Sequence, residues 1–251
     1  MTRLQAEFHR LYLPLSPEAS GADSDTRALV LELARPADWE RLSKAWRGVQ
    51  TDLELPAPAI AVSGTDGIQL WFSLCEPVSI AQAHAFLESL RCRYLPDVAP
   101  QRVRLMPAVD VSTTPGATVH APKVPALQGA TGNWSAFVAP DLAPLFSETP
   151  WLDIPPGDDG QANLLSRLDS IKPPLFAAAL AQLRAAEDQV TADKLKLETA
   201  ASPVATQKRT YGGDLDPKSF LLAVMNDDGA SLALRIEAAK ALLPYTADVR
   251  S

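Results

Sequence analysis

A turn and the strand after it carry the residue types that could hold a nucleotide. In AVSGTDGIQLWFSL, residues 61–74, Ser63 and Gly64 lie in a turn, and the alternation that follows sets Gln69 and Trp71 opposite an aliphatic stripe. A serine hydroxyl and a glycine N–H can donate to phosphate oxygens, and an indole can stack on a base. The same residues equally suit an ordinary turn and a strand packed under a helix.

Two groups of basic residues could meet phosphates. The densest basic cluster consists of Arg91, Arg93, Arg102 and Arg104. Strand alternation predicts Arg102 and Arg104 on one face, where they could track a nucleic-acid backbone or pair with acids of the chain. His120 and Lys123 flank a proline loop and could approach a triphosphate, or could be plain surface groups.

The composition restricts the classes of partner and compartment. A formal charge of −7 over 251 residues means that nucleic acid must be met by a local basic patch. Cys75 and Cys92 are too few for a disulfide framework or a zinc cluster, which favours a reduced cytoplasmic setting. The N-terminus lacks a signal-peptide core, and no apolar run reaches the ~20 residues of a membrane span. No metal-ligand spacing or Walker loop is present.

The elements that must position these residues predict an α+β fold. Short aliphatic runs predict strands at residues 27–34, within 55–63, and at 68–74, 102–106, 117–121 and 134–138. Helical periodicity predicts helices from Pro36, within 76–95, at 164–171 and at 173–190. Ser79 and Gln82 predict a capping box for the second helix. This order favours a mixed or antiparallel sheet with flanking helices over a doubly wound fold.

Changes in composition along the sequence predict four parts. They are an N-terminal lead-in at residues 1–26, an α+β domain at 27–192, a linker at 193–213 and a C-terminal helical module at 214–251. In the module, Pro217 begins one helix, Ser231 caps a second, and Pro244 ends it.

Segments of the α+β region resemble, in order, the motifs of the archaeo-eukaryotic primase superfamily, the primase-polymerases. LVLELARP stands where that family has a strand with paired acids, SGTDGIQLWFSL where it has a hairpin with a histidine, and RVRLMPAVD where a third strand carries another acid. TVHAPKVPALQGATGNWSAFVAPDLAPLF resembles the closing part of the core, with a basic residue for the phosphates. The resemblance covers about half of the chain, roughly residues 27–152.

The resemblance implies a metal-dependent nucleotide site. Glu32 and Asp110 would be the ligands of Mg²⁺ or Mn²⁺. The nucleotide-facing positions would be Ser63, Gly64, Gln69, His120 and Lys123.

The motifs depart from the family where its chemistry is most demanding. Two-metal catalysis requires several carboxylates around the metal pair. The next same-face position after Glu32 is Ala34, and Asp110 follows Pro107 instead of lying within the third strand. Gln69 stands at the histidine position, and an amide cannot carry a proton as imidazole does. Because the partner acid and the histidine are missing, the catalytic set is predicted to be degraded. A lone carboxylate at position 32 could instead pair with a neighbouring arginine.

The C-terminal module has a second resemblance. DPKSFLLAVMNDDGASLALRIEAAKALLPY is similar to a short helical module of phage and prophage proteins, some of them small-terminase-like. The resemblance implies a mobile-element protein. Because Glu237 lies beside Arg235 and Lys240, the exposed face of the second helix is not basic, which favours protein docking or self-association over entry into a DNA groove.

The sequence therefore predicts a cytoplasmic, catalytically degenerate, primase-polymerase-like accessory protein of a phage or mobile element. It would bind nucleic acid or a nucleotide in replication or packaging, and its C-terminal helices would contact a partner or another copy. One alternative is an active nucleotidyltransferase, with Glu32 and Asp110 as metal ligands and Ser63 and Lys123 at the phosphates. The other is a protein-interaction adaptor without affinity for nucleotides or nucleic acid.

Overall fold

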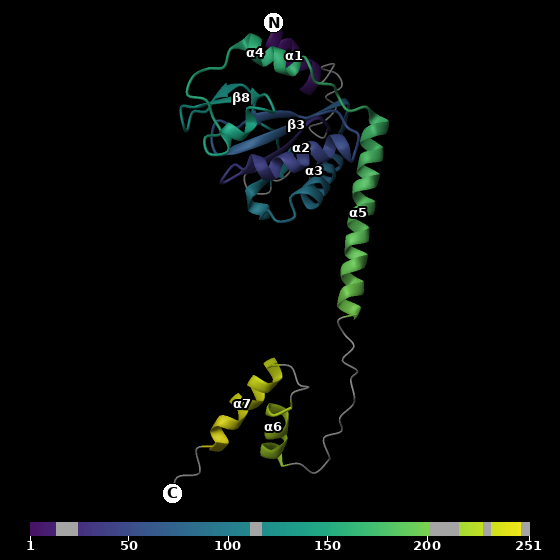
Figure 1. The fold of residues 1–251 in the computed structure, drawn as a ribbon, viewed down its shortest axis with the longest axis vertical. Helices are drawn as coiled ribbons and strands as arrows, with labels where there is room; N and C mark the ends of the chain where they lie inside the picture. The colour runs from purple at the N-terminus through teal and green to yellow at the C-terminus, as the bar shows by residue number, and fades with distance from the viewer. Residues whose placement is uncertain (14–24, 111–116, 201–215, 228–231, 247–251) are drawn as a thin grey trace. The chain divides into compact units, whose positions relative to one another are not determined.

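A computed structural model describes residues 1–13, 25–110, 117–200, 216–227 and 232–246. The chain divides into two compact units, Met1–Lys194 and Leu195–Ser251. The first unit combines antiparallel strands with helices, and the described residues of the second belong to the end of one long helix and to two shorter helices (Figure 1). The predicted α+β fold with an antiparallel sheet and flanking helices is confirmed. Among the described residues, no helix has both the length and the apolar character needed to cross a membrane.

Six antiparallel strands form the main sheet, in the order β4–β1–β3–β2–β8–β7. These strands are β1 (Asp25–Ala34), β2 (Ala59–Val62), β3 (Gly67–Ser79), β4 (Val103–Met106), β7 (Ala126–Leu127) and β8 (Trp134–Val138). A separate two-stranded sheet pairs β5 (Ala108–Asp110) with β6 (Ala117–Val119). The predicted strands thus form, and the long pairing of β1 with β3 makes the centre of the sheet.

One face of the main sheet carries the larger apolar core. Helices α2 (Trp39–Thr51) and α3 (Ile80–Tyr94) and the beginning of α5 (Pro173–Ala200) pack on this face. The aliphatic stripe of β3 lies here, with Ile68, Leu70 and Phe72 all buried, because alternate residues of a strand point to one side. The predicted capping box forms at the start of α3, where the Ser79 hydroxyl accepts a hydrogen bond from the Gln82 N–H.

The opposite face is covered by α1 (Arg3–Tyr12) and α4 (Asp158–Leu165), which lie side by side (Figure 1). Residues 1–26 are predicted to be a polar lead-in, but part of this segment is helix α1. Leu4, Phe8 and Leu11 recur at helical spacing and are buried against the sheet. Residues Thr2 and Gln5 form a capping box that begins the helix.

Two predicted boundaries in the second half of the first unit are wrong. The helix expected at 164–171 is α4, which ends at Leu165; Ile171 then pairs with β3, accepting a hydrogen bond from the Cys75 N–H. Helix α5 continues to Ala200, so residues 193–200 of the predicted linker are helical. Residues 201–215 lie outside the described part of the chain.

The second unit contains α6 (Pro217–Met225) and α7 (Leu232–Thr246), which pack against each other. Pro217 occupies the first turn of α6, as predicted, where a missing N–H costs nothing. Pro244 does not end α7, which continues to Thr246. The predicted cap, Ser231, lies outside the described residues.

Candidate functional site

A row of three polar side chains crosses the α1-facing side of the sheet. Glu32 on β1 is in register with Gln69 on β3 and with Arg104 on β4. Directly opposed residues in antiparallel strands share a face, so the three side chains meet. Gln69 Nε2 donates to Glu32 Oε2 at 3.2 Å, and Arg104 Nη1 donates to Glu32 Oε1 at 2.9 Å. Both carboxylate oxygens of Glu32 are therefore engaged by neighbouring side chains.

Glu32 is deeply buried for an acidic residue, with 3% of its surface exposed. Gly67 makes this possible, because a Cβ at position 67 would collide with the Glu32 carboxylate. Burial raises the pKa of Glu32, since the charged form loses hydration; the Arg104 charge and the Gln69 hydrogen bond act against this rise, while nearby Asp66 adds to it. The net direction is upward, so burial outweighs the ion pair.

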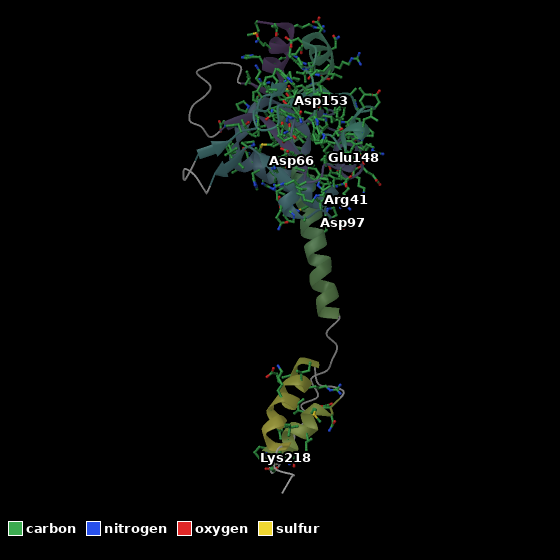
Figure 2. The ribbon with its side chains drawn as sticks, turned by 90° about the vertical axis from the view of Figure 1, so that its left-hand side faces the viewer. Arg41, Asp66, Asp97, Glu148, Asp153 and Lys218 are labelled. Atoms are coloured by element: carbon green, nitrogen blue, oxygen red, sulfur yellow. The ribbon has the colours of Figure 1, made fainter. Side chains whose placement is uncertain are left out.

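Arg104 also binds a second carboxylate, that of Asp66. Its two terminal nitrogens donate to the two oxygens of Asp66 at 3.2 Å each (Asp66 is labelled in Figure 2). Arg35 Nε lies 3.6 Å from the same carboxylate. Neither Asp66 nor Arg35 is among the predicted site residues. Asp66 lies in the SGTDG turn and Arg35 follows β1 directly, but only the pairing of β1 with β3 brings them together.

Arg102 lies just before β4, in a short 3-10 helix, η2 (Pro100–Arg102). The prediction that Arg102 belongs to the same strand as Arg104 is therefore wrong, because the 3-10 turn includes Arg102 and β4 begins only at Val103. Arg102 instead donates to the backbone oxygens of Ala34, at 3.3 Å, and of Pro36, at 2.7 Å.

Three arginines thus gather at the end of β1, and we call Arg35, Arg102 and Arg104 the arginine cluster. The carboxylates bound to the cluster are those of Glu32 and Asp66. Arg35 and Arg104 contact these two anions, whereas Arg102 contacts backbone oxygens, so the charge of Arg102 has no carboxylate partner in the contacts described.

Trp71 is buried in an aromatic group on the same face. Its ring meets those of Tyr12 and Phe137 edge to face, with centroids 5.2 and 5.8 Å away, and Phe8 completes the group. Its indole N–H donates to Gln69 Oε1 at 2.8 Å. Only 2% of Trp71 is exposed, so this residue packs under a helix, which is one of the two roles that the sequence allows. A base has no access to the indole in this arrangement.

Ser63 and Gly64 form a turn whose polar groups are used within the protein. The Ser63 hydroxyl accepts hydrogen bonds from the N–H groups of Thr65 and Gly67. Gly64 adopts a φ of 80°, which favours glycine, and its N–H donates to the carbonyl of Pro150. This geometry is that of a turn, and neither donor points to open space for a phosphate.

The remaining candidates lie in other parts of the first unit. Asp110 belongs to the β5–β6 sheet, whereas Glu32 belongs to the main sheet, and the Asp110 side chain is outside what the structure describes. His120 and Lys123 follow β6 and are exposed. Both stay available to solvent as single basic groups.

Arg91 and Arg93 lie on α3 and bind acids of the chain. Arg91 pairs with Glu88 on the same helix. Arg93 Nη2 lies 3.4 Å from Asp52 Oδ2 and its guanidinium stands over the Tyr94 ring. The structure thus separates these two arginines from the arginine cluster, so the four predicted residues do not form one patch.

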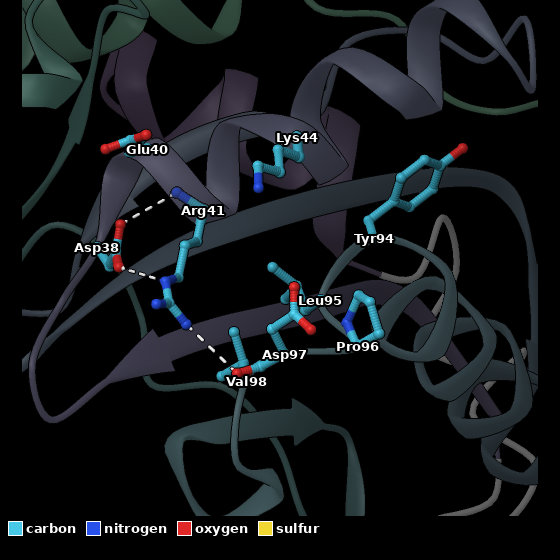
Figure 3. A pocket seen from close by; sticks show the side chains of 9 residues that line it. All are labelled: Asp38, Glu40, Arg41, Lys44, Tyr94, Leu95, Pro96, Asp97 and Val98. Atoms are coloured by element: carbon cyan, nitrogen blue, oxygen red, sulfur yellow. Dashed lines mark hydrogen bonds and ion pairs between the residues drawn. The ribbon is translucent and has the colours of Figure 1, made fainter.

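A hollow of about 320 Å³ lies between α2 and the segment after α3 (Figure 3). Arg41 crosses it, with Nε 3.0 Å from Asp38 Oδ2 and Nη1 donating to the Asp97 carbonyl at 3.3 Å. The residues that line it are Asp38, Glu40, Arg41, Lys44, Tyr94, Leu95, Pro96, Asp97 and Val98. No residue predicted for the nucleotide site is among them.

The donor set near Glu32 does not fit a two-metal centre. The Arg104 guanidinium lies between the carboxylates of Glu32 and Asp66, where it already provides positive charge. Among the described residues, no three His, Cys, Asp or Glu side chains form a group that could hold a metal ion. No family model matches this sequence, and no curated protein matches it significantly. Function is therefore inferred from the site.

Proposed function

We propose that this protein is a non-catalytic, nucleic-acid-binding accessory factor with a primase-polymerase-like core. It would act in the cytoplasm, in the replication or packaging of a phage or mobile element. The observation that carries the proposal is the arginine cluster, in which Arg104 binds the carboxylate that would otherwise serve catalysis, Arg35 lies beside Asp66, and Arg102 binds backbone oxygens at the end of β1.

The surroundings of Glu32 support the non-catalytic part of the proposal. Both oxygens of Glu32 accept hydrogen bonds from Gln69 and Arg104, and the Arg104 cation provides the positive charge that a metal ion would bring. Breaking the pair with Arg104 would leave a buried charge without compensation, which is strongly unfavourable. The geometry thus favours a binding role over nucleotidyl transfer.

Phosphate binding is favoured by the excess charge of the arginine cluster. The Arg35 side chain is 61% exposed, and its φ of 53° holds the residue in a left-handed conformation that side chains rarely adopt. Arg102 is bound by backbone carbonyls, so no carboxylate neutralises it in the contacts described. Guanidinium groups match phosphate oxygens in geometry and charge. One excess charge predicts weak, salt-sensitive binding that does not depend on base sequence.

A salt titration tests this proposal. Binding of a fluorescent single-stranded or duplex DNA is measured by anisotropy from low to physiological salt. We expect affinity to fall as salt rises, and Arg35→Ala to weaken binding several-fold and reduce the salt slope by about one phosphate contact. Arg47→Ala is the matched control, because Arg47 is an exposed arginine of α2. Absence of binding at low salt would contradict the proposal and favour the adaptor.

The enzyme alternative is tested separately. Primer extension and primer synthesis are measured with Mg²⁺ or Mn²⁺, using the wild type and Glu32→Ala. We expect no incorporation by either protein. Metal-dependent incorporation that Glu32→Ala abolishes would establish the active nucleotidyltransferase instead, with Asp110 as the next residue to replace.

A protein-interaction role is the second candidate. It is favoured by α6 and α7, which expose large apolar side chains despite packing against each other. These exposed residues are Phe220, Leu222, Leu234 and Ile236. The two roles are compatible, since the helices and the arginine cluster are different parts of the chain.

A further inference from the structure

We infer that α6 and α7 form a self-association element, whose occupant is the same pair of helices from a second copy of this chain. The two hairpins would pack as a symmetric four-helix bundle and bury the apolar side chains that a single hairpin leaves exposed.

The starting observation is the poor burial within the hairpin. Six consecutive residues of α6, Phe220 to Met225, are apolar, yet no residue of this helix is buried. On α7, Ala238 and Leu242 are buried, whereas Leu234 is 60% and Ile236 is 46% exposed. Leu222 on α6 is 40% exposed. The apolar surface thus belongs to both helices, as expected of one half of a larger bundle.

The size and composition of the module restrict how it can be stabilised. The described hairpin falls within residues 216–246, below the roughly 40 residues under which disulfides, metals or oligomerisation are usually required. The whole second unit, residues 195–251, contains neither cysteine nor histidine. Disulfides and zinc sites of the usual kind are thereby excluded, and association remains.

The charges of the hairpin favour a second copy over a charged partner. Residues 216–246 contain three basic and four acidic side chains, whereas the chain as a whole has a formal charge of −7. Two copies can approach through this segment with little repulsion. A basic face for nucleic acid is missing, because Lys240 pairs with Glu237 on the exposed side of α7. An isologous dimer also needs no second kind of surface, because both copies contribute the same one.

Sedimentation velocity of the full chain tests the inference. Over about 1–100 µM, the range of common specific associations, we expect a concentration-dependent monomer–dimer equilibrium. Replacing Leu222 and Ile236 together by glutamate should raise the dissociation constant at least tenfold. The matched control is Ile154→Glu, because Ile154 is an apolar residue of the first unit with 72% exposure; this change should leave the equilibrium unaltered.

Three outcomes would overturn the inference. The first is a wild type that stays monomeric at about 100 µM. The second is an equilibrium that Ile154→Glu disrupts and the double substitution does not. The third is a monomer whose α6 and α7 amides resist hydrogen exchange as strongly as the core, which would mean docking within the same chain. If the glutamates melt the helices by circular dichroism, Leu222→Gln with Ile236→Gln repeats the test at lower cost to folding.

A dimer would carry two arginine clusters. This consequence depends on the proposed function, whereas self-association does not. Two weak phosphate sites on one particle bind DNA more tightly than either site alone, through effective concentration. A double-glutamate variant that becomes monomeric but keeps the DNA affinity of the wild type would remove this consequence and leave the dimer itself supported.

Discussion

Two neighbouring regions on one face of the sheet are closed to solvent in opposite ways. Around Trp71, four aromatic rings from α1, β3 and β8 pack together. Around Glu32, a carboxylate is enclosed by hydrogen bonds and an ion pair. The regions meet at the bond between the Trp71 indole and the Gln69 amide, two residues apart on β3.

The two regions differ in the kind of interaction that stabilises them. The aromatic region is held by apolar burial, which has no preferred partner and little dependence on pH. The charged region is directional and asymmetric, because the Glu32 side chain is 4% exposed whereas that of Arg104 is 39% exposed. Removing the exposed partner should therefore cost more than removing the buried one.

Trp71→Ala is expected to have the largest effect. Deleting a fully buried indole should lower the free energy of unfolding by about 3–5 kcal/mol. Urea titration followed by circular dichroism measures the loss. Phe72→Ala is the control on the opposite face of the same strand, where the ring is equally buried. A loss for Trp71→Ala far below that of Phe72→Ala would mean that the aromatic region is not a true core and opens readily.

Arg104→Met should have the next largest effect. It leaves the Glu32 carboxylate buried without its cation, which is expected to cost about 3 kcal/mol at neutral pH. Arg91→Met is the mirror-image control, because the Arg91 side chain is the less exposed of its pair, at 17%, and the side chain of its partner Glu88 is 41% exposed. Leaving Glu88 to water should cost less than about 1 kcal/mol. Equal losses in the two variants would refute the asymmetry.

The sequence predicts the two faces of β3 correctly but not what covers them. Strict alternation assigns Gln69 and Trp71 to one side, and the structure confirms this. The sequence-based prediction misses helix α1, because the polar composition of residues 1–26 as a whole suggests a loop. The Thr2–Gln5 capping box and the spacing of Leu4 and Phe8 were the signals that could have identified it.

The composition of the charged region was less accessible to sequence reasoning. The sequence allows an arginine partner for Glu32, but the identity of this arginine depends on the register between β1 and β4, whose paired residues are 72 positions apart in the chain. Asp66 joins only through the pairing of β1 with β3. Arg102 is not part of strand β4, because it is the last residue of the 3-10 turn that begins at Pro100. Such contacts follow from tertiary packing, which local periodicity does not encode.

Tyr12→Phe should stabilise the aromatic region. The Tyr12 hydroxyl is the one buried side-chain polar atom in the described residues without a hydrogen-bond partner, and burial raises the pKa of this phenol. Removing an unsatisfied hydroxyl should raise the free energy of unfolding by about 1 kcal/mol. Tyr94→Phe, which loses a bond to Asp52 at the surface, should instead be neutral or slightly destabilising. A loss of stability in Tyr12→Phe would indicate a partner for this hydroxyl, such as an internal water.

Glu32→Gln is expected to have the smallest effect at neutral pH and the most informative pH dependence. The amide fills the same space, and Arg104 keeps both its exposure and its bonds to Asp66. The free energy of unfolding at pH 7 should therefore stay within about 1 kcal/mol of the wild type. Burial raises the pKa of Glu32 above its ordinary value of 4.5, so the folded wild type binds this proton more tightly than the unfolded chain.

The contribution of Glu32 to stability is thus fully present below pH 4.5 and is lost as the pH rises through the raised pKa. Glutamine cannot undergo this loss, so the stability of Glu32→Gln relative to the wild type should increase as the pH is raised from about 4 to 7. Paired urea titrations across this range measure the trend. A relative stability that instead falls with rising pH would show that the attraction of Arg104 exceeds the cost of burying the carboxylate. The pKa of Glu32 would then be lowered, and the pair would hold the charged form that a metal-binding carboxylate requires.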